Sequence, residues 1–423
     1  MTGETSPLEA RRAALPSSYR LFYENPVVVD HTEGVWIHDA TGTPLLDVYN
    51  NVPVVGHSNA HVADRVAAQL RTANTHTRYV YPSVAEYASR LESLFPAELN
   101  KTIFTCSGSE AVDLALQVAR FTTGHEGVIA TSHAYHGTTA ATHAVSPSLS
   151  RRFLDDRIAL VDVPEDALAA GDAGEEFGRR VREAIATLEA RGVGFAALIM
   201  DQVLTSDGVF TDPVGFMAPV REAVRASGGV FIADEVQSGF GRTGTRMWGF
   251  DRHGIVPDLV ILGKPMGNGL PIAALVGTAE LLNTYGDTFR YFNTFGGNPV
   301  CIAAADAVLD EIERLDILAN VVTTGALLRQ GLADTLTAHG LDAHVRGTGL
   351  IAGGDLSASR ETPAESKKLV DAIVNGLRNR GVLISSTGPR GTVLKVRPPL
   401  VFKPEHAERV LSALDDTLTQ LAP

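Results

Sequence analysis

The feature that most constrains the fold is a succession of short, nearly uninterrupted apolar segments between residues 101 and 276. Helical patterns and polar loops separate these segments. An apolar run without alternation fits a strand that is buried on both faces, as in parallel sheets covered by helices. We therefore predict an α/β fold with a mostly parallel sheet. Its strands would be residues 101–105, 127–131, 158–163, 195–200, 229–233, 258–262 and 272–276.

The chain on either side of this block has a different pattern. Residues 35–38 and 45–49 flank a turn rich in Thr, Gly and Pro, which predicts a β-hairpin. After residue 299, long helical patterns lead to short strands, which predicts a smaller α+β region. The helices would be residues 61–72, 84–95, 109–121, 300–314, 318–338 and 404–421, and the later strands would lie near residues 345–353, 382–385 and 393–396.

Length and pattern together predict a division of the 423 residues into domains. Residues 61–310 would form a large domain that contains the parallel sheet. Residues 311–423 would form a smaller C-terminal domain, against which the N-terminal segment 1–60 packs.

Composition narrows the possible partners and compartment. The formal net charge of −13 argues against binding to nucleic acid or to an anionic membrane, so any anion site must be a local basic pocket. Cys106 and Cys301 provide no disulfide framework, which favours a reducing cytoplasm. The N-terminus has no apolar signal-peptide core, and no apolar run approaches the ~20 residues that span a bilayer. We expect a cytoplasmic protein.

Two of the predicted strands are followed by side chains of opposite charge. Asp234 follows the strand at 229–233, and Lys264 follows the strand at 258–262. Ligands of open α/β sheets bind at the carboxyl ends of the strands, so both side chains lie where a ligand is expected. A lysine amine can hold pyridoxal phosphate (PLP) covalently, and a carboxylate can keep its pyridine nitrogen protonated. Each residue alone could be an ordinary loop or capping residue, but together they favour PLP.

A segment of small residues before the helix at 109–121 provides a site for the cofactor's phosphate. Ser107, Gly108 and Ser109 let backbone N–H groups approach an anion at the positive end of a helix. An ordinary serine N-cap would have the same sequence, so this pattern alone does not decide between the two readings.

Two other patterns are weaker. The glycines of residues 239–244 match a dinucleotide-binding pattern, but no apolar helix follows them, so we predict a loop. A nicotinamide-dependent dehydrogenase would need that pattern to bind its cofactor. His133, His136 and His143 lie close in sequence, yet no acid or cysteine completes a ligand set, and we predict no metal site.

Taken together, residues 21–421 resemble the class III aminotransferases, PLP enzymes of fold type I. The segment 234–244 resembles the family signature. The resemblance implies a homodimer with its sites at the interface. It also implies roles for residues at matching positions: Lys264 bonds to the cofactor, Asp234 binds the pyridine nitrogen, Gln237 lies near the ring hydroxyl, Tyr135 stacks on the ring beside His136, Ser107, Gly108 and Ser109 hold the phosphate, and Thr294 reaches the phosphate in the neighbouring subunit.

Two departures from that family are informative. Members that use amino acids carry an arginine for the substrate carboxylate where this chain has Lys395. Many also carry a glutamate that shields this arginine, at the position of Ser206 here. The device that lets an aminotransferase accept two substrates is therefore missing, although Arg397 nearby could replace the arginine.

Several segments resemble a subgroup of the family, the ethanolamine-phosphate phospho-lyases. These segments are residues 20–23, 50–57, 74–79 and 263–269. The resemblance implies elimination of phosphate from O-phosphoethanolamine, giving acetaldehyde and ammonia. The sequence leaves a phosphohydroxylysine or an aminophosphonate open as the substrate instead. Residues expected to bind the substrate phosphate are Arg78, Tyr19, Lys395 and Arg397. A class III aminotransferase that moves an amino group to a keto acid is the alternative, and a PLP-fold binding or regulatory protein is a further one.

Overall fold

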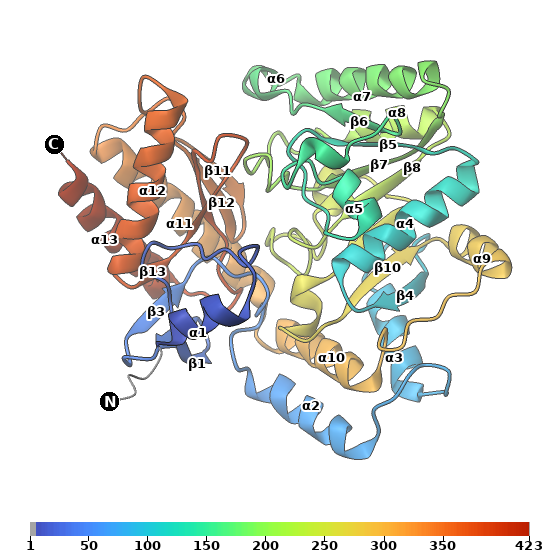
Figure 1. Ribbon diagram of the computed structural model, residues 1–423, viewed down its shortest axis with the longest axis horizontal. Helices are drawn as coiled ribbons and strands as arrows, with labels where there is room; N and C mark the ends of the chain where they lie inside the picture. The colour runs from blue at the N-terminus through green and yellow to red at the C-terminus, as the bar shows by residue number, and fades with distance from the viewer. Residues whose placement is uncertain (1–5, 423) are drawn as a thin grey trace.

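The computed structural model describes residues 6–422 and contains a large α/β domain beside a smaller one (Figure 1). The large domain is built on a seven-stranded sheet with the order β4-β10-β9-β8-β7-β5-β6. Strand β10 runs antiparallel to both of its neighbours, and the remaining pairs are parallel, which confirms the predicted fold class. The strands are β4 (Lys101–Thr105), β5 (Gly127–Thr131), β6 (Ile158–Val161), β7 (Phe195–Asp201), β8 (Val230–Asp234), β9 (Leu259–Leu262) and β10 (Ala273–Gly277).

Both faces of this sheet are buried, as the uninterrupted apolar runs require. In β9, Leu259 and Ile261 belong to one apolar core, whereas Val260 and Leu262 belong to another. Successive strand residues point to opposite faces, so a run that lacks polar residues needs helices on both sides. Helix α4 (Gly108–Thr123) covers one face, and α7 (Ala173–Ala190), α8 (Ala218–Ala226) and α10 (Pro299–Arg314) cover the other.

Helix α4 has clear start and stop signals. Ser107 accepts a hydrogen bond from the Glu110 N–H, and the Glu110 carboxylate accepts one from the Ser107 N–H. This reciprocal capping box satisfies N–H groups at the helix start. Gly124 ends the helix with φ = +69°, a conformation that glycine adopts without a steric penalty. The helix end that faces the predicted cofactor site is therefore fixed by local sequence.

The small domain joins the two ends of the chain. Strand β3 (Pro44–Asp47) pairs antiparallel with β2 (Trp36–Asp39), which confirms the predicted hairpin, and β3 also pairs parallel with β13 (Val382–Leu383). Strand β1 (Val29–Glu33) extends this sheet. A second sheet, ordered β11-β12-β15-β14, contains β11 (His344–Thr348), β12 (Ile351–Asp355), β14 (Ser385–Thr387) and β15 (Val393–Val396). The segment near residues 345–353 is therefore a hairpin.

Helices complete both domains. In the small domain, α11 (Ile317–Ala338), α12 (Pro363–Asn379) and α13 (Pro404–Leu421) cover the sheets. The sequence pattern did not identify α12. Further helices are α1 (Pro7–Ala14), α2 (Ala60–Thr72), α3 (Pro82–Glu92), α5 (Ala140–Ala144), α6 (Glu165–Ala170) and α9 (Ala279–Thr288), with single 3₁₀ turns η1 (Arg151–Phe153), η2 (Phe250–His253) and η3 (Lys264–Gly267). Within residues 6–422, no helix is both long and apolar enough to cross a bilayer.

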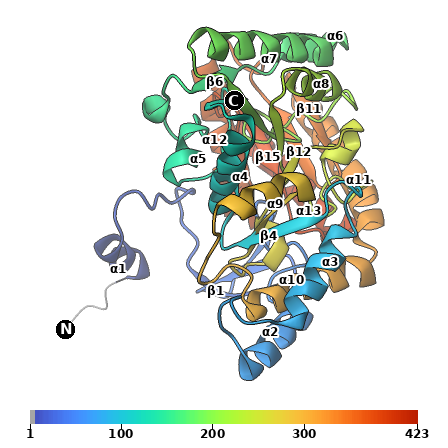
Figure 2. The same ribbon diagram turned by 90° about the vertical axis from the view of Figure 1, so that its right-hand side faces the viewer.

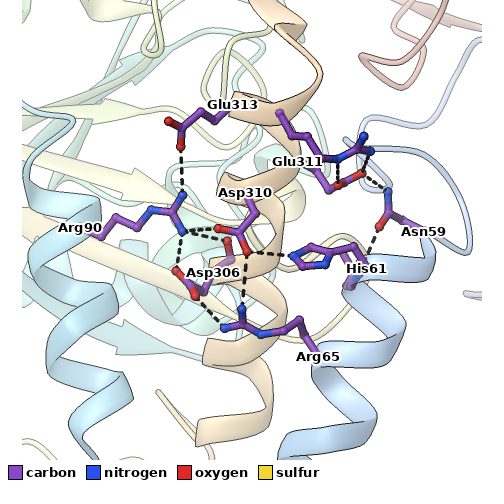
Figure 3. Close-up of polar contacts among 10 residues, drawn as sticks. Asn59, His61, Arg65, Arg90, Asp306, Asp310, Glu311 and Glu313 are labelled. Carbon is purple, nitrogen blue, oxygen red and sulfur yellow. Dashed lines mark hydrogen bonds and ion pairs between the residues drawn. The ribbon is translucent and has the colours of Figure 1, made fainter.

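An ion-pair cluster fastens α2 and α3 to α10 (Figure 3). Asp306 and Asp310, one turn apart on α10, accept hydrogen bonds from Arg90 of α3, each at 2.7 Å. From α2, Arg65 donates to Asp306 at 2.8 Å and His61 lies 2.8 Å from Asp310. The loop that joins α2 to α3, which carries residues 74–79, is thereby anchored at both ends.

Candidate active site

A cavity of about 180 Å³ lies at the carboxyl ends of the central strands. Asp201 ends β7 and Asp234 ends β8, where the two are paired in register, while Lys264 follows β9. Tyr135 follows β5. The cavity brings together most of the predicted cofactor residues and three that were not predicted: its lining is Gly108, Ser109, Tyr135, His136, Gly137, Asp201, Asp234, Val236, Gln237 and Lys264.

Lys264 stands at the start of η3, and its side chain reaches into the cavity. Its backbone has φ = +26°, in the left-handed region that non-glycine residues rarely adopt. Its Nζ lies 5.9 Å from the centre of the Tyr135 ring. Burial, together with the positive charge of Arg397, lowers the pKa of Lys264 to about 8, against the opposing effects of Asp234 and Asp201. A modest change in surroundings makes this amine neutral, which both a nucleophile and a base require.

Asp234 is held by groups on either side of its carboxylate. His136 Nδ1 donates to Oδ2 at 2.6 Å, and the Val236 N–H donates to Oδ1 at 3.0 Å. The backbone N–H of His136 donates to Ser146 Oγ at 2.8 Å. His136 therefore contacts the aspartate and fixes its orientation toward the cavity.

The first turn of α4 meets the loop after β5 at close range. The Thr138 N–H donates to Ser109 Oγ at 3.1 Å. Gly137 has φ = +140°, and a Cβ built there would come within 2.8 Å of Ser109 Cβ. Only glycine therefore lets this loop approach the helix start, where backbone N–H groups can bind an anion. Ser107 caps the helix and is exposed, and it does not line the cavity.

A chain of polar contacts runs along another wall of the cavity. Arg397 NH1 donates to Gln237 Oε1, and Gln237 Nε2 donates to Thr205 Oγ1 at 2.6 Å. Thr205 Oγ1 donates to the Asp201 carboxylate. Asp201 and Thr205 were not predicted as site residues. The available signal was that Asp201, like Asp234, ends an apolar strand with an acid.

The two predicted phosphate-binding residues near Pro398 differ in their contacts. Arg397 also donates to the Tyr49 carbonyl through Nε and NH2, each at 3.2 Å, so it is committed to protein acceptors. Lys395, on β15, is buried, and no hydrogen bond joins its Nζ to another residue in the described part of the chain. Burial and the charge of Arg397 lower the pKa of Lys395 well below its usual value.

Six predicted residues are not among those that line this cavity. Ser107, Lys395 and Arg397 are described above, and the other three are exposed. Arg78 is exposed and stacks on Phe292, with 3.9 Å between its guanidinium carbon and the ring centre. Thr294, two residues beyond Phe292, is exposed as well. Tyr19 is 61% exposed on the N-terminal segment. Within one chain, these side chains are not brought together with Lys264.

Comparison with known proteins identifies the family of this chain. Residues 21–418 match the family model for class-III aminotransferases. The chain belongs to the class III aminotransferase family. It is therefore a PLP enzyme.

Both lyases and aminotransferases are among its relatives. A phospholyase from Arthrobacter, solved in complex with phosphoethanolamine, is 41% identical, with a TM-score of 0.93 over 99% of this chain and 100% of that one. Ethanolamine-phosphate phospho-lyase homolog 1 of Caenorhabditis elegans is 33% identical, covering 97% of this chain and 93% of that protein. An alanine–glyoxylate aminotransferase 2-like protein of Drosophila melanogaster is 34% identical, covering 98% and 87%.

The cavity fits the cofactor that this family uses. Gly137 and the first turn of α4 leave room that a side chain would fill, at the place where a phosphate would meet backbone N–H groups. The Asp234 carboxylate and the Lys264 amine line the same cavity. A cation-binding carboxylate, an amine and an anion cradle are the groups that PLP needs from a protein.

Proposed function

We propose that this enzyme eliminates phosphate from O-phosphoethanolamine, with water completing the reaction to acetaldehyde, ammonia and phosphate. The observation that carries the proposal is the buried Lys395, at the position where amino-acid-using relatives carry a carboxylate-binding arginine. No hydrogen bond joins its Nζ to a protein acceptor among the described residues, so the amine is free to bind a phosphate. The negative charge of a phosphate would favour the protonated amine, against the effect of burial. The likeness to the Arthrobacter phospholyase and to the C. elegans homologue supports the same substrate class.

The residues of the cavity would have different roles in such a reaction. When bound, PLP would supply an electron sink, so that the carbon bearing the substrate amine can lose a proton. Lys264 Nζ is the base that removes this proton, and its lowered pKa favours the neutral amine that a base requires. Asp234, oriented by His136, would hold the pyridine nitrogen. Gln237, held by Arg397 and Thr205, would lie near the ring hydroxyl.

Binding of the substrate phosphate falls first to Lys395. Arg397 is engaged by Tyr49 and Gln237, so we assign it to positioning Gln237. Arg78 and Tyr19 are the remaining candidates, and both are exposed away from the cavity of their own chain. They can take part when a second chain places them over the site.

We infer that the enzyme is a homodimer with sites at the interface. None of the residues of α1 is buried, and this helix stands away from the domains in Figure 2. Tyr79, Phe292 and Phe295 are exposed, and exposed aromatic groups of this kind mark association surfaces. Thr294 lies among them, as a residue donated to a neighbouring site would. We also expect action in the cytoplasm, where the free thiols of Cys106 and Cys301 stay reduced.

The aminotransferase alternative is favoured by the D. melanogaster relative, and an acceptor-free assay separates the two. The holoenzyme is mixed with O-phosphoethanolamine without a keto acid, and phosphate and acetaldehyde are measured, with unphosphorylated ethanolamine and a phosphohydroxylysine as comparison amines. We expect both products to form together, and a Lys395→Met enzyme to show a KM raised roughly tenfold or more. Turnover that requires pyruvate or 2-oxoglutarate would establish the aminotransferase instead.

A further inference from the structure

Asp207 is a buried carboxylate that the proposed chemistry does not use. It is 6% exposed and lies in the loop that follows β7. Thr131 Oγ1 donates to its Oδ2 at 2.8 Å, and the His133 N–H donates to its Oδ1 at 3.2 Å. Thr131 is the last residue of β5, and His133 lies two residues before Tyr135. The Asp207 carboxylate thus accepts hydrogen bonds from two residues, Thr131 and His133, of the segment that leads to Tyr135.

The main chain around Asp207 is fixed by the small domain. The Gly388 N–H donates to the Ser206 carbonyl at 3.2 Å. Arg346 Nε, from β11, donates to the Gly208 carbonyl at 3.1 Å. The residues immediately before and after Asp207 are therefore both bound by the other domain. The carboxylate is presented from a rigid loop rather than from a mobile one.

Other contacts fix the far side of Tyr135. The His136 N–H donates to Ser146 Oγ, and its Nδ1 donates to Asp234. On the near side, the Ala134 N–H donates to the Thr131 carbonyl at 3.2 Å, which closes a turn. Tyr135 therefore lies between two anchors. Asp207 is the anchor on the β5 side.

We propose that Asp207 is a positioning residue: by holding Thr131 and His133, it sets the main chain before Tyr135 and so the place of the Tyr135 ring over the cofactor. This inference rests on the proposed role of Tyr135. A small displacement of a group that contacts a reacting molecule lowers rates steeply, so an anchor two residues away has a measurable effect.

The environment of Asp207 indicates which substitute can replace it. Burial raises the pKa of Asp207 to about 7, opposed by the Thr131 hydrogen bond and reinforced by Asp201. Both polar contacts of the carboxylate given above are hydrogen bonds that it accepts. An asparagine keeps a carbonyl for the His133 N–H, and its amide can donate to the Thr131 hydroxyl. An alanine leaves the Thr131 hydroxyl and the His133 N–H without the acceptor that Asp207 provides.

The test compares Asp207→Ala and Asp207→Asn, with Asp212→Ala as the matched control. Asp212 belongs to the same connection after β7, but it is exposed and pairs with Arg252 instead. In the apoprotein, hydrogen exchange of residues 132–137 is measured. In the holoenzyme, PLP affinity and the visible circular dichroism of bound PLP are measured. None of these readouts uses a substrate, so failure of the proposed reaction does not affect them.

We expect Asp207→Ala to speed exchange at His133 and to weaken PLP affinity by roughly tenfold, with altered circular dichroism. Asp207→Asn should stay within about threefold of wild type, and so should Asp212→Ala. If Asp207→Ala does not fold, Thr131→Val removes one of the two contacts from the opposite side and should produce the same changes more weakly. An alanine variant that is less stable but keeps exchange, affinity and dichroism would overturn the inference, as would an asparagine variant that behaves like alanine.

Discussion

At the scale of single residues, the lowered pKa of Lys264 favours its proposed role as a base but also lowers the free energy of unfolding. The pKa of this amine is about 8 in the folded chain, below its ordinary value of 10.5. The unfolded chain therefore binds more protons between about pH 8 and pH 10.5, and the free energy of unfolding rises with pH across this window. Below pH 8 the destabilising effect of the buried charge is fully present.

Replacing Lys264 by methionine removes this effect. At pH 7 we expect the Lys264→Met apoprotein to gain up to about 3 kcal/mol of unfolding free energy, because each unit of pKa shift corresponds to about 1.4 kcal/mol. The gain should shrink above pH 8 and vanish near pH 10.5. Urea denaturation of the apoprotein at several pH values measures it. Lys368→Met, at an exposed position on α12, is the control and should show no such trend. A gain that does not vary with pH would contradict this account.

At the scale of elements, the approach of the β5–α5 loop to the start of α4 depends on Gly137. A Cβ at this position would meet the backbone of Ser109, whose Cα lies within 2.9 Å of it, so either the loop or the helix start must move. We expect Gly137→Ala to weaken PLP affinity by roughly a hundredfold, since displaced N–H groups no longer converge on the phosphate. Titration of the apoprotein with PLP measures this change.

The other end of the same helix provides the control. Gly124 also has a positive φ, but no atom lies within 4 Å of a Cβ built on it. Gly124→Ala should therefore lower stability by about 1 kcal/mol through backbone strain alone, and it should leave PLP affinity unchanged. Equal losses of PLP affinity in the two variants would show that the close contact with Ser109 is not what matters.

Local sequence was enough to predict an element where a single local signal determines its position. The strands of the large sheet follow from apolar runs, and the start of α4 follows from Ser107 and its capping partner. Asp234 and Lys264 could be predicted because each directly follows such a run. The hairpin of β11 and β12 could not be separated from a single strand, since its turn depends on Gly347 and Gly349, whose positive φ values are set by tertiary packing. Thr205 and Asp207 were missed because Gln237 and Thr131, with which they form hydrogen bonds, lie far away in the sequence.

At the scale of the whole molecule, the two domains meet in the loop after β7. Asp201, the last residue of β7, lines the cavity, and the loop that follows is bound by Arg346 and Gly388 of the small domain. At the position of Ser206, the resemblance to the family implies a glutamate in many members. The Ser206 carbonyl is hydrogen-bonded to the other domain. The loop after β7 is therefore held by the small domain at this position.

The proposed dimer implies that each site draws residues from two chains. Lys264 lines the cavity of its own chain, whereas Thr294 is exposed near Phe292 and does not line that cavity. A Lys264→Ala chain and a Thr294→Ala chain should each form poorly active dimers. In a mixed dimer, twofold symmetry puts both defects in one site and leaves the other site intact.

Coexpression of the two variants under separate affinity tags tests this arrangement. If the chains assemble at random, half of the dimers are mixed, and the pool should regain roughly a quarter of the wild-type rate of phosphate release. Dimers purified through both tags should regain about half of the wild-type rate, since one of the two sites in each dimer is intact. Coexpression of Lys264→Ala with Asp234→Ala is the control, because both defects belong to one chain's cavity and no mixed dimer has an intact site. Recovery in the control, or its absence in the test pair, would mean that Thr294 does not act across the interface.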